Sequence, residues 1–144
     1  MLVGQFGVGE PVTANNIRAF FNGIHGSQSV WQPIFQSSYD RWESISGLDF
    51  EFEANDDGAP WATSGGLLGT RADMRLSSHS IDGQSGSNTL AYNFFPDFAD
   101  MVIDSDNLSF YSNATNGYVR TRNVLAHETG HGLGMHHVIS SDSR

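Results

Sequence analysis

The chain has 144 residues, no cysteine and a formal net charge of −9 from 16 acidic and 7 basic residues. Its length fits a single domain, 1–144, and a hydrophobic fraction of 38% argues against disorder. The acidic balance disfavours nucleic acid and anionic membranes as partners, and the lack of cysteine excludes disulfides, thiol nucleophiles and cysteine metal sites.

The N-terminal third predicts two helices. Residues 1–6 have neither a basic region nor an apolar core, so no signal peptide is expected in this chain. Residues 13–24, with Thr13 as N-cap, predict a short helix. Apolar residues recur at helical spacing over residues 29–46, and Gly47 follows as a stop signal.

The middle of the chain predicts strands. Residues 48–53 alternate strictly between apolar and acidic side chains, which indicates a half-buried strand. Three further strand candidates are residues 69–76, 90–95 and 100–104. The Ser- and Gly-rich residues 77–88 predict a long loop. Helices followed by strands and a late helix indicate an α/β (α+β) fold, a mixed sheet packed by helices.

The last predicted helix runs from about Thr121 to Leu133 and carries the motif H-E-x-x-H. Residues four apart on an α-helix differ by about 40° around the axis and about 6 Å along it. His127 and His131 therefore project from one face at a spacing that suits a single ion. Zinc accepts imidazole nitrogen and prefers tetrahedral geometry, so a third protein ligand would leave one position for water.

Gly134 and the histidines after it suggest where the third ligand lies. A glycine three residues after His131 lets the helix end and the chain turn back. His137 is then expected to approach the metal, with His136 as the competitor. The spacing from Gly134 favours His137.

Glu128 lies beside a ligand but projects at a different angle. We expect it to act as general base on a zinc-bound water whose pKa the metal lowers to about 7. Gly130 and Gly132 each cost about 1 kcal/mol in a helix interior relative to alanine. Their presence suggests a close approach of neighbouring backbone to the site.

The full pattern, H-E-x-x-H-x-x-G-x-x-H, is the metzincin signature. Within that clan the chain most resembles the matrixins, the matrix-metalloprotease-like group. Residues 38–50 resemble the family's first helix and second strand, residues 71–76 its third strand, and residues 90–96 its fourth. The resemblance covers most of residues 30–137.

The resemblance implies a zincin-like fold whose twisted sheet has an edge strand that binds substrate and whose active-site helix lies near the C-terminus. It implies a secreted or extracellular zinc endopeptidase, expected to be a monomer, that acts on protein or peptide substrates. Such substrates would bind in extended form antiparallel to the edge strand, by β-augmentation.

The resemblance does not extend to the family's second, structural zinc. His79 and Asp82 match part of that site, but Tyr92 and Val102 stand where two further histidines are expected. A lone histidine in a Ser-rich loop is better explained as an exposed loop residue. Catalytic zinc is therefore expected, and structural zinc is not.

Acidic residues suggest a different cation. Asp82 and the run Asp104 to Asn107 resemble calcium-binding residues of the family, and calcium prefers hard oxygen ligands. The alternative is that they are ordinary acidic surface loops in an acidic chain.

The C-terminal sequence departs from the family pattern. Metzincins have a Met-turn after the third histidine, whereas Met135 precedes His137, and Val138 replaces a common serine. We expect a fragment that is incomplete at both ends. The alternative to an active endopeptidase is a non-catalytic zinc-containing peptide-binding module or an inactive fragment.

Overall fold

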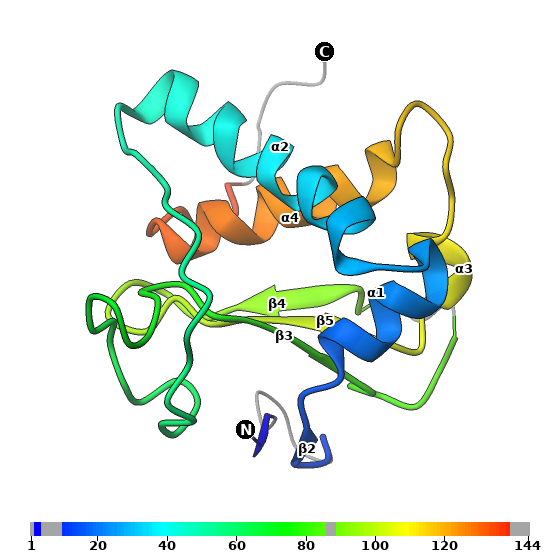
Figure 1. The fold of residues 1–144 in the computed structure, drawn as a ribbon, viewed down its shortest axis with the longest axis horizontal. Helices are drawn as coiled ribbons and strands as arrows, with labels where there is room; N and C mark the ends of the chain where they lie inside the picture. The colour runs from blue at the N-terminus through cyan, green and yellow to red at the C-terminus, as the bar shows by residue number, and fades with distance from the viewer. Residues whose placement is uncertain (1, 4–9, 86–88, 139–144) are drawn as a thin grey trace.

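The computed structural model describes residues 2–3, 10–85 and 89–138. Figure 1 shows helices α2 and α4 side by side above a small sheet, with α1 packed at one end. In chain order the elements are β1 (Leu2–Val3), β2 (Thr13–Ala14), α1 (Ile17–His25), α2 (Gln28–Ser46), β3 (Leu76–His79), β4 (Ala91–Asn93), β5 (Met101–Asp104), α3 (Leu108–Tyr111) and α4 (Val119–Gly132).

The central sheet is mixed, as the sequence predicted. Its order is β3-β5-β4, with β3 parallel and β4 antiparallel to β5. Within the described residues β4 pairs on one side only, so it is an edge strand. The α+β zincin-like class and the edge position of the fourth-strand segment are both confirmed.

Strand β5 separates two apolar clusters because its side chains alternate between faces. Met101 and Ile103 face the helices, whereas Val102 faces the opposite side, and all three are fully buried. The helix-side cluster also contains Phe21, Trp31, Phe35, Tyr111, Val124 and Leu125. The other cluster contains Val3, Trp61, Ile81 and Tyr92. Burying each large side chain stabilises the fold by about 1.5–3 kcal/mol. Because β5 contributes side chains to both clusters, it lies at the centre of the core.

The helix over residues 29–46 is confirmed as α2. It ends at Gly47, whose φ of 73° lies in the left-handed region that glycine adopts without strain. The strands predicted over residues 90–95 and 100–104 are confirmed as β4 and β5, each shorter than predicted.

The strand predicted over residues 48–53 is wrong, because these residues are irregular. Alternation creates two faces, but a strand also needs a neighbour to pair with. Here the N–H of Phe50 donates to Glu43 Oε1 at 2.8 Å, and Leu48 and Phe52 stay about half exposed. The segment is therefore held by helix α2 and not by the sheet.

The third strand lies later than predicted. Residues 69–75 form turns and an isolated bridge, and β3 begins at Leu76, so the predicted loop over residues 77–88 starts as a strand. Gly69 has a φ of 72° and turns the chain inside the predicted strand. Residues 86–88 of that loop lie outside the described residues.

Two helix starts are also corrected. Thr13 pairs in β2, and α1 begins at Ile17 because the Asn15 side chain accepts N–H groups from Ile17 and Ser78. The last helix begins at Val119 with Tyr118 as N-cap, before the predicted Thr121 or Asn123, and ends at Gly132.

Candidate metal centre

Helix α4 is oriented by α2, which packs along it. The Trp42 indole N–H donates to the Ala126 carbonyl at 3.0 Å, and an added Cβ at Gly130 would lie 3.3 Å from the Trp42 ring. At Gly132 an added Cβ would lie 2.5 Å from Asn93 Nδ2. Both glycines thus lie close to neighbouring residues, but the prediction of neighbouring backbone is wrong, because the atoms that approach them belong to side chains.

The chain reverses directly after α4. Gly134 has a φ of 95°, and the N–H of Met135 donates back to the Gly130 carbonyl at 2.9 Å. An added Cβ at Gly134 would also lie 3.3 Å from Pro96 Cγ. The predicted turn at Gly134 is confirmed, and it returns His137 toward the helix.

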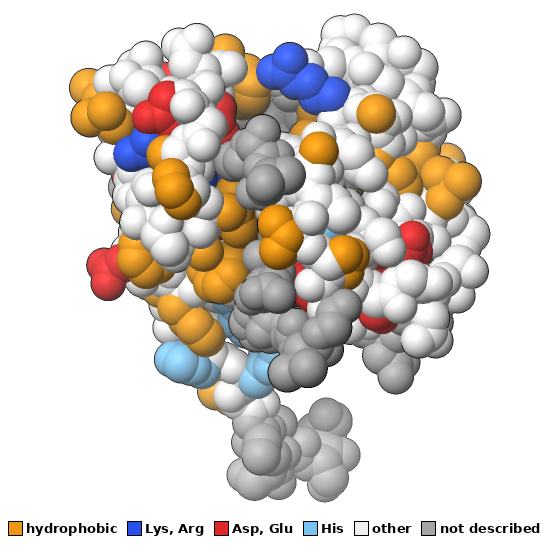
Figure 2. Space-filling model, turned by 90° about the horizontal axis from the view of Figure 1, so that it is seen from below, with side chains coloured by type: hydrophobic (Ala, Val, Ile, Leu, Met, Phe, Trp, Pro, Cys, Tyr) orange, Lys and Arg blue, Asp and Glu red, His pale blue; other side chains and the backbone are white. Residues whose placement is uncertain are grey.

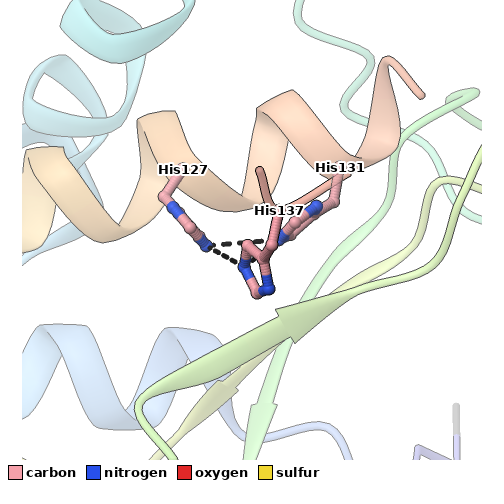
Figure 3. Close-up of side chains that lie close together, drawn as sticks. All are labelled: His127, His131 and His137. Carbon is pink, nitrogen blue, oxygen red and sulfur yellow. Dashed lines mark hydrogen bonds between the residues drawn. The ribbon is translucent and has the colours of Figure 1, made fainter. Parts of the chain in front are cut away.

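Three imidazoles meet at this turn. Figure 3 shows His127 and His131 projecting from α4 and His137 approaching from the segment that follows it. The Nε2 atom of His137 lies 3.0 Å from Nε2 of both His127 and His131, and those two atoms are 3.2 Å apart. A tetrahedral zinc with Zn–N bonds of about 2.0–2.1 Å spaces its nitrogens about 3.3–3.4 Å apart. The separations are within a few tenths of an ångström of that value.

The protonation of the rings suits a metal. The His131 Nδ1 atom lies 2.6 Å from the Met135 carbonyl oxygen, which only accepts, so Nδ1 carries the proton and Nε2 keeps its lone pair. Burial, followed by the charges of His131 and His137, lowers the pKa of His127 and favours its neutral form. Neutral imidazole is the form that binds zinc.

Among the described residues the donor set has three imidazoles, which fits a zinc ion that keeps a fourth position for water. Lone pairs that converge this closely repel one another unless a cation lies between them. The three side chains range from exposed to half-buried, so one side of the centre faces solvent. Three imidazoles with an open fourth position are the ligand pattern of catalytic zinc, since structural sites use four protein ligands.

Glu128 lies beside the histidines and is buried, with 8% of its surface exposed. Burial raises the pKa of its carboxyl group, and the nearby His131 opposes the shift. Glu128 and the three histidines line a cleft of about 820 Å³, and Tyr92, Asn93 and Phe95 line it as well. Figure 2 shows histidine side chains at the surface, next to apolar side chains.

His136 is not part of the centre. Its ring stacks on Phe95 with centroids 4.4 Å apart, while His137 joins the other two imidazoles. We therefore expect His137→Ala to weaken zinc binding by more than about 100-fold, because removing groups that only orient ligands already costs 10–100-fold. His136→Ala should change the affinity less than about threefold. Competition with a chromophoric chelator measures both, and a larger loss in His136→Ala would reverse the assignment.

The prediction that His79 is an exposed loop residue is wrong. His79 ends β3 and is 1% exposed. Its Nε2 lies 2.8 Å from Glu10 Oε1 and its Nδ1 lies 3.0 Å from Thr13 Oγ1, and the Tyr92 hydroxyl also donates to Glu10 Oε1 at 2.8 Å. Both ring nitrogens thus have protein partners, so the residues do not fit a second zinc at this position.

The acidic residues expected to bind calcium are brought together only in part. Carboxylate oxygens of Asp82, Asp104 and Asp106 lie within 4.8 Å of one another. Asp104 is buried, and burial raises its pKa. Its oxygens accept N–H groups from Ile81, Asp106 and Asn107. Asp104 therefore holds these loop residues together through its hydrogen bonds. Calcium binding stays a prediction.

Sequence reasoning did not identify Glu10 or Asn93 as part of the site region. Glu10 has no motif around it, and it reaches His79 and Tyr92 only through the fold. Asn93 lies within a predicted strand, where a single polar residue carries no signal of its partner. Strand alternation alone predicts only that the side chains of Asn93 and Tyr92 point to opposite faces of the sheet.

Comparison with known proteins identifies a family for most of the chain. The family described as Matrixin matches residues 24–143. No curated protein and no solved structure matches the chain. Among the helices of the described residues, none has the length and apolar character needed to cross a membrane.

Proposed function

The chain belongs to the matrixin family, and from this premise we propose that it is a zinc-dependent endopeptidase that hydrolyses internal bonds of extended polypeptides. The observation that carries the proposal is the convergence of three Nε2 atoms, 3.0–3.2 Å apart, beside a buried carboxylate. His127, His131 and His137 are the proposed zinc ligands, and Glu128 is the proposed general base.

Glu128 is suited to move the protons of the reaction. When bound, zinc supplies a Lewis acid that polarises the scissile carbonyl and makes a water more acidic. The Glu128 carboxylate takes a proton from the attacking water while the water oxygen bonds to the scissile carbonyl carbon. As the C–N bond breaks, the same carboxyl group returns that proton to the leaving nitrogen. Burial raises the carboxyl pKa, which makes the carboxylate a stronger base toward the attacking water.

Strand β4 is the proposed docking edge for substrate. Among the described residues, β4 pairs with β5 along one edge, and the proposal places an extended peptide along its other edge by β-augmentation. Residues of β4 line the same cleft as Glu128 and the histidines. A peptide paired along β4 would therefore pass beside the proposed base.

We propose a protein or peptide as the partner, with the chain acting as a monomer at an extracellular location. The location rests on the family alone. Calcium at Asp82, Asp104 and Asp106 is a separate proposal, supported by the approach of their carboxylates.

The test is incubation of an unstructured protein with the chain, followed by mass spectrometry of the products. We expect internal cuts that 1,10-phenanthroline abolishes and added zinc restores. Release of single terminal residues would contradict an endopeptidase, and cuts that persist in the chelator would contradict a zinc enzyme.

A further inference from the structure

Asn93 joins the proposed substrate strand to the main chain of the proposed base. It is the last residue of β4 and is 5% exposed. Its side-chain Nδ2 donates to the carbonyl oxygen of Glu128 at 2.7 Å. Because a carbonyl only accepts, the amide nitrogen must face the helix.

The surroundings of Asn93 are built around this bond. An added Cβ at Gly132 would lie 2.5 Å from Asn93 Nδ2 and 2.5 Å from Met74 Cε. Gly132 therefore leaves the space in which the amide rests against the last turn of α4. An alanine at either position would remove the hydrogen bond or crowd it.

The amide is kept although it leaves one polar atom unsatisfied. Among the described residues, Asn93 Oδ1 is buried and has no hydrogen-bond partner. Burying such an atom without a partner lowers stability, whereas an apolar side chain of the same size would avoid that loss. Packing alone thus gives no reason for asparagine here, and the Nδ2 bond to Glu128 does.

The side chains on the two faces of β4 bond to different parts of the fold. Tyr92 points away from α4 and donates to Glu10, while Asn93 points toward α4 and donates to Glu128. The main chain of Asn93 pairs with Met101 of the central strand. One residue is therefore fixed to the sheet through its backbone and to the helix through its side chain.

We infer that Asn93 is a positioning residue that sets the distance between a peptide on β4 and the carboxylate of Glu128. The inference rests on the proposed function. A misplacement of about 1 Å between reacting groups can cost about 100-fold in rate. The Asn93 amide bonds to the Glu128 carbonyl and is not among the atoms that converge on the proposed zinc position, so zinc is expected to stay bound when the amide is removed.

The test compares Asn93→Ala and Asn93→Asp with a matched control, Ser77→Ala. Asp keeps the size of Asn but, when ionised, cannot donate to a carbonyl. Ser77 is fully buried on the opposite edge strand and also donates to a main-chain carbonyl, that of Met101 at 3.0 Å. Its loss should lower stability without moving the base.

We expect kcat to fall about 10- to 100-fold in both Asn93 variants, with KM within about threefold and one zinc still bound. Ser77→Ala should lower the melting temperature about as much as the Asn93 variants do, while its kcat stays at the wild-type value. An unchanged kcat in Asn93→Ala, or an equal loss in Ser77→Ala, overturns the inference.

Hydrogen exchange gives a readout that needs no activity. Amides of residues 128–132 should exchange about tenfold faster in Asn93→Ala than in the wild type, because one hydrogen bond to the helix is lost. If the wild-type chain cleaves nothing, the proposed function fails, yet this exchange still decides whether Asn93 holds the main chain of Glu128. If the amides of residues 128–132 exchange no faster in Asn93→Ala than in Ser77→Ala, that role is overturned.

Discussion

Glu128→Ala is expected to lower kcat/KM for peptide cleavage by at least about 100-fold while one zinc stays bound. General acid–base catalysis contributes about 10²- to 10⁴-fold, and among the described residues Glu128 is the carboxylate next to the three imidazoles in the cleft. The other carboxylates of the cleft, Glu10 and Asp82, lie in the His79 and Asp104 groups. The three imidazoles do not use the Glu128 side chain, so zinc affinity should be retained.

Glu128→Gln separates the loss of basicity from the loss of volume. Glutamine fills the same space and forms hydrogen bonds, but it cannot take a proton from water. We expect it to be as inactive as alanine, with bound zinc measured by atomic absorption and folding checked by circular dichroism. Wild-type cleavage by either zinc-loaded variant would show that another group is the base.

Asp100→Ala is expected to lower the free energy of unfolding by about 3–5 kcal/mol, the cost of leaving a buried charge without its partner. The Arg75 guanidinium donates to Asp100 through Nη2 at 2.6 Å and through Nε at 3.0 Å, and both side chains are nearly fully buried. The same carboxylate accepts the N–H of Ala62 at 2.8 Å. Asp100 thus anchors residues 59–62 to the start of β5.

The measurement is thermal unfolding, where the loss should lower the midpoint by roughly 10–20 °C. Asp57→Ala is the matched control, because Asp57 pairs with Arg71 at the surface. Exposed ion pairs contribute little, so this variant should melt close to the wild type. Equal melting of Asp100→Ala and Asp57→Ala would mean that the buried pair does not hold this part of the fold.

The zinc motif was predictable because its geometry is local. Four-residue spacing places His127 and His131 on one helix face, and Gly134 permits the turn that returns His137. The structure brings these three imidazoles together as the spacing requires. Their roles as ligands, and the role of Glu128 as base, stay predictions.

The sheet was harder to predict, because strand pairing depends on distant neighbours. The alternation in residues 48–53 was correct as a pattern, but Glu43 binds the segment to α2 and no strand forms. The strand over residues 100–104 was predicted to within one residue, since a short apolar run between two acids indicates a buried strand.

Polar contacts across the fold had no signal in the sequence at all. His79 was interpreted from its Ser-rich surroundings, yet it is buried because Glu10, 69 residues earlier, accepts from its ring. Asn93 reaches Glu128 over 35 residues. Such pairs are specified by three-dimensional packing, and a single sequence does not reveal them.

The most direct test of a catalytic zinc centre is a titration of zinc into the metal-free chain, in which bound zinc and the cleavage rate are followed together. The three-histidine centre, with His79 occupied by Glu10 and Thr13, predicts that both rise in parallel and level off at one equivalent. Binding of one equivalent without cleavage would contradict the account and indicate a peptide-binding module. A cleavage rate that needs a second equivalent would contradict the single-zinc site.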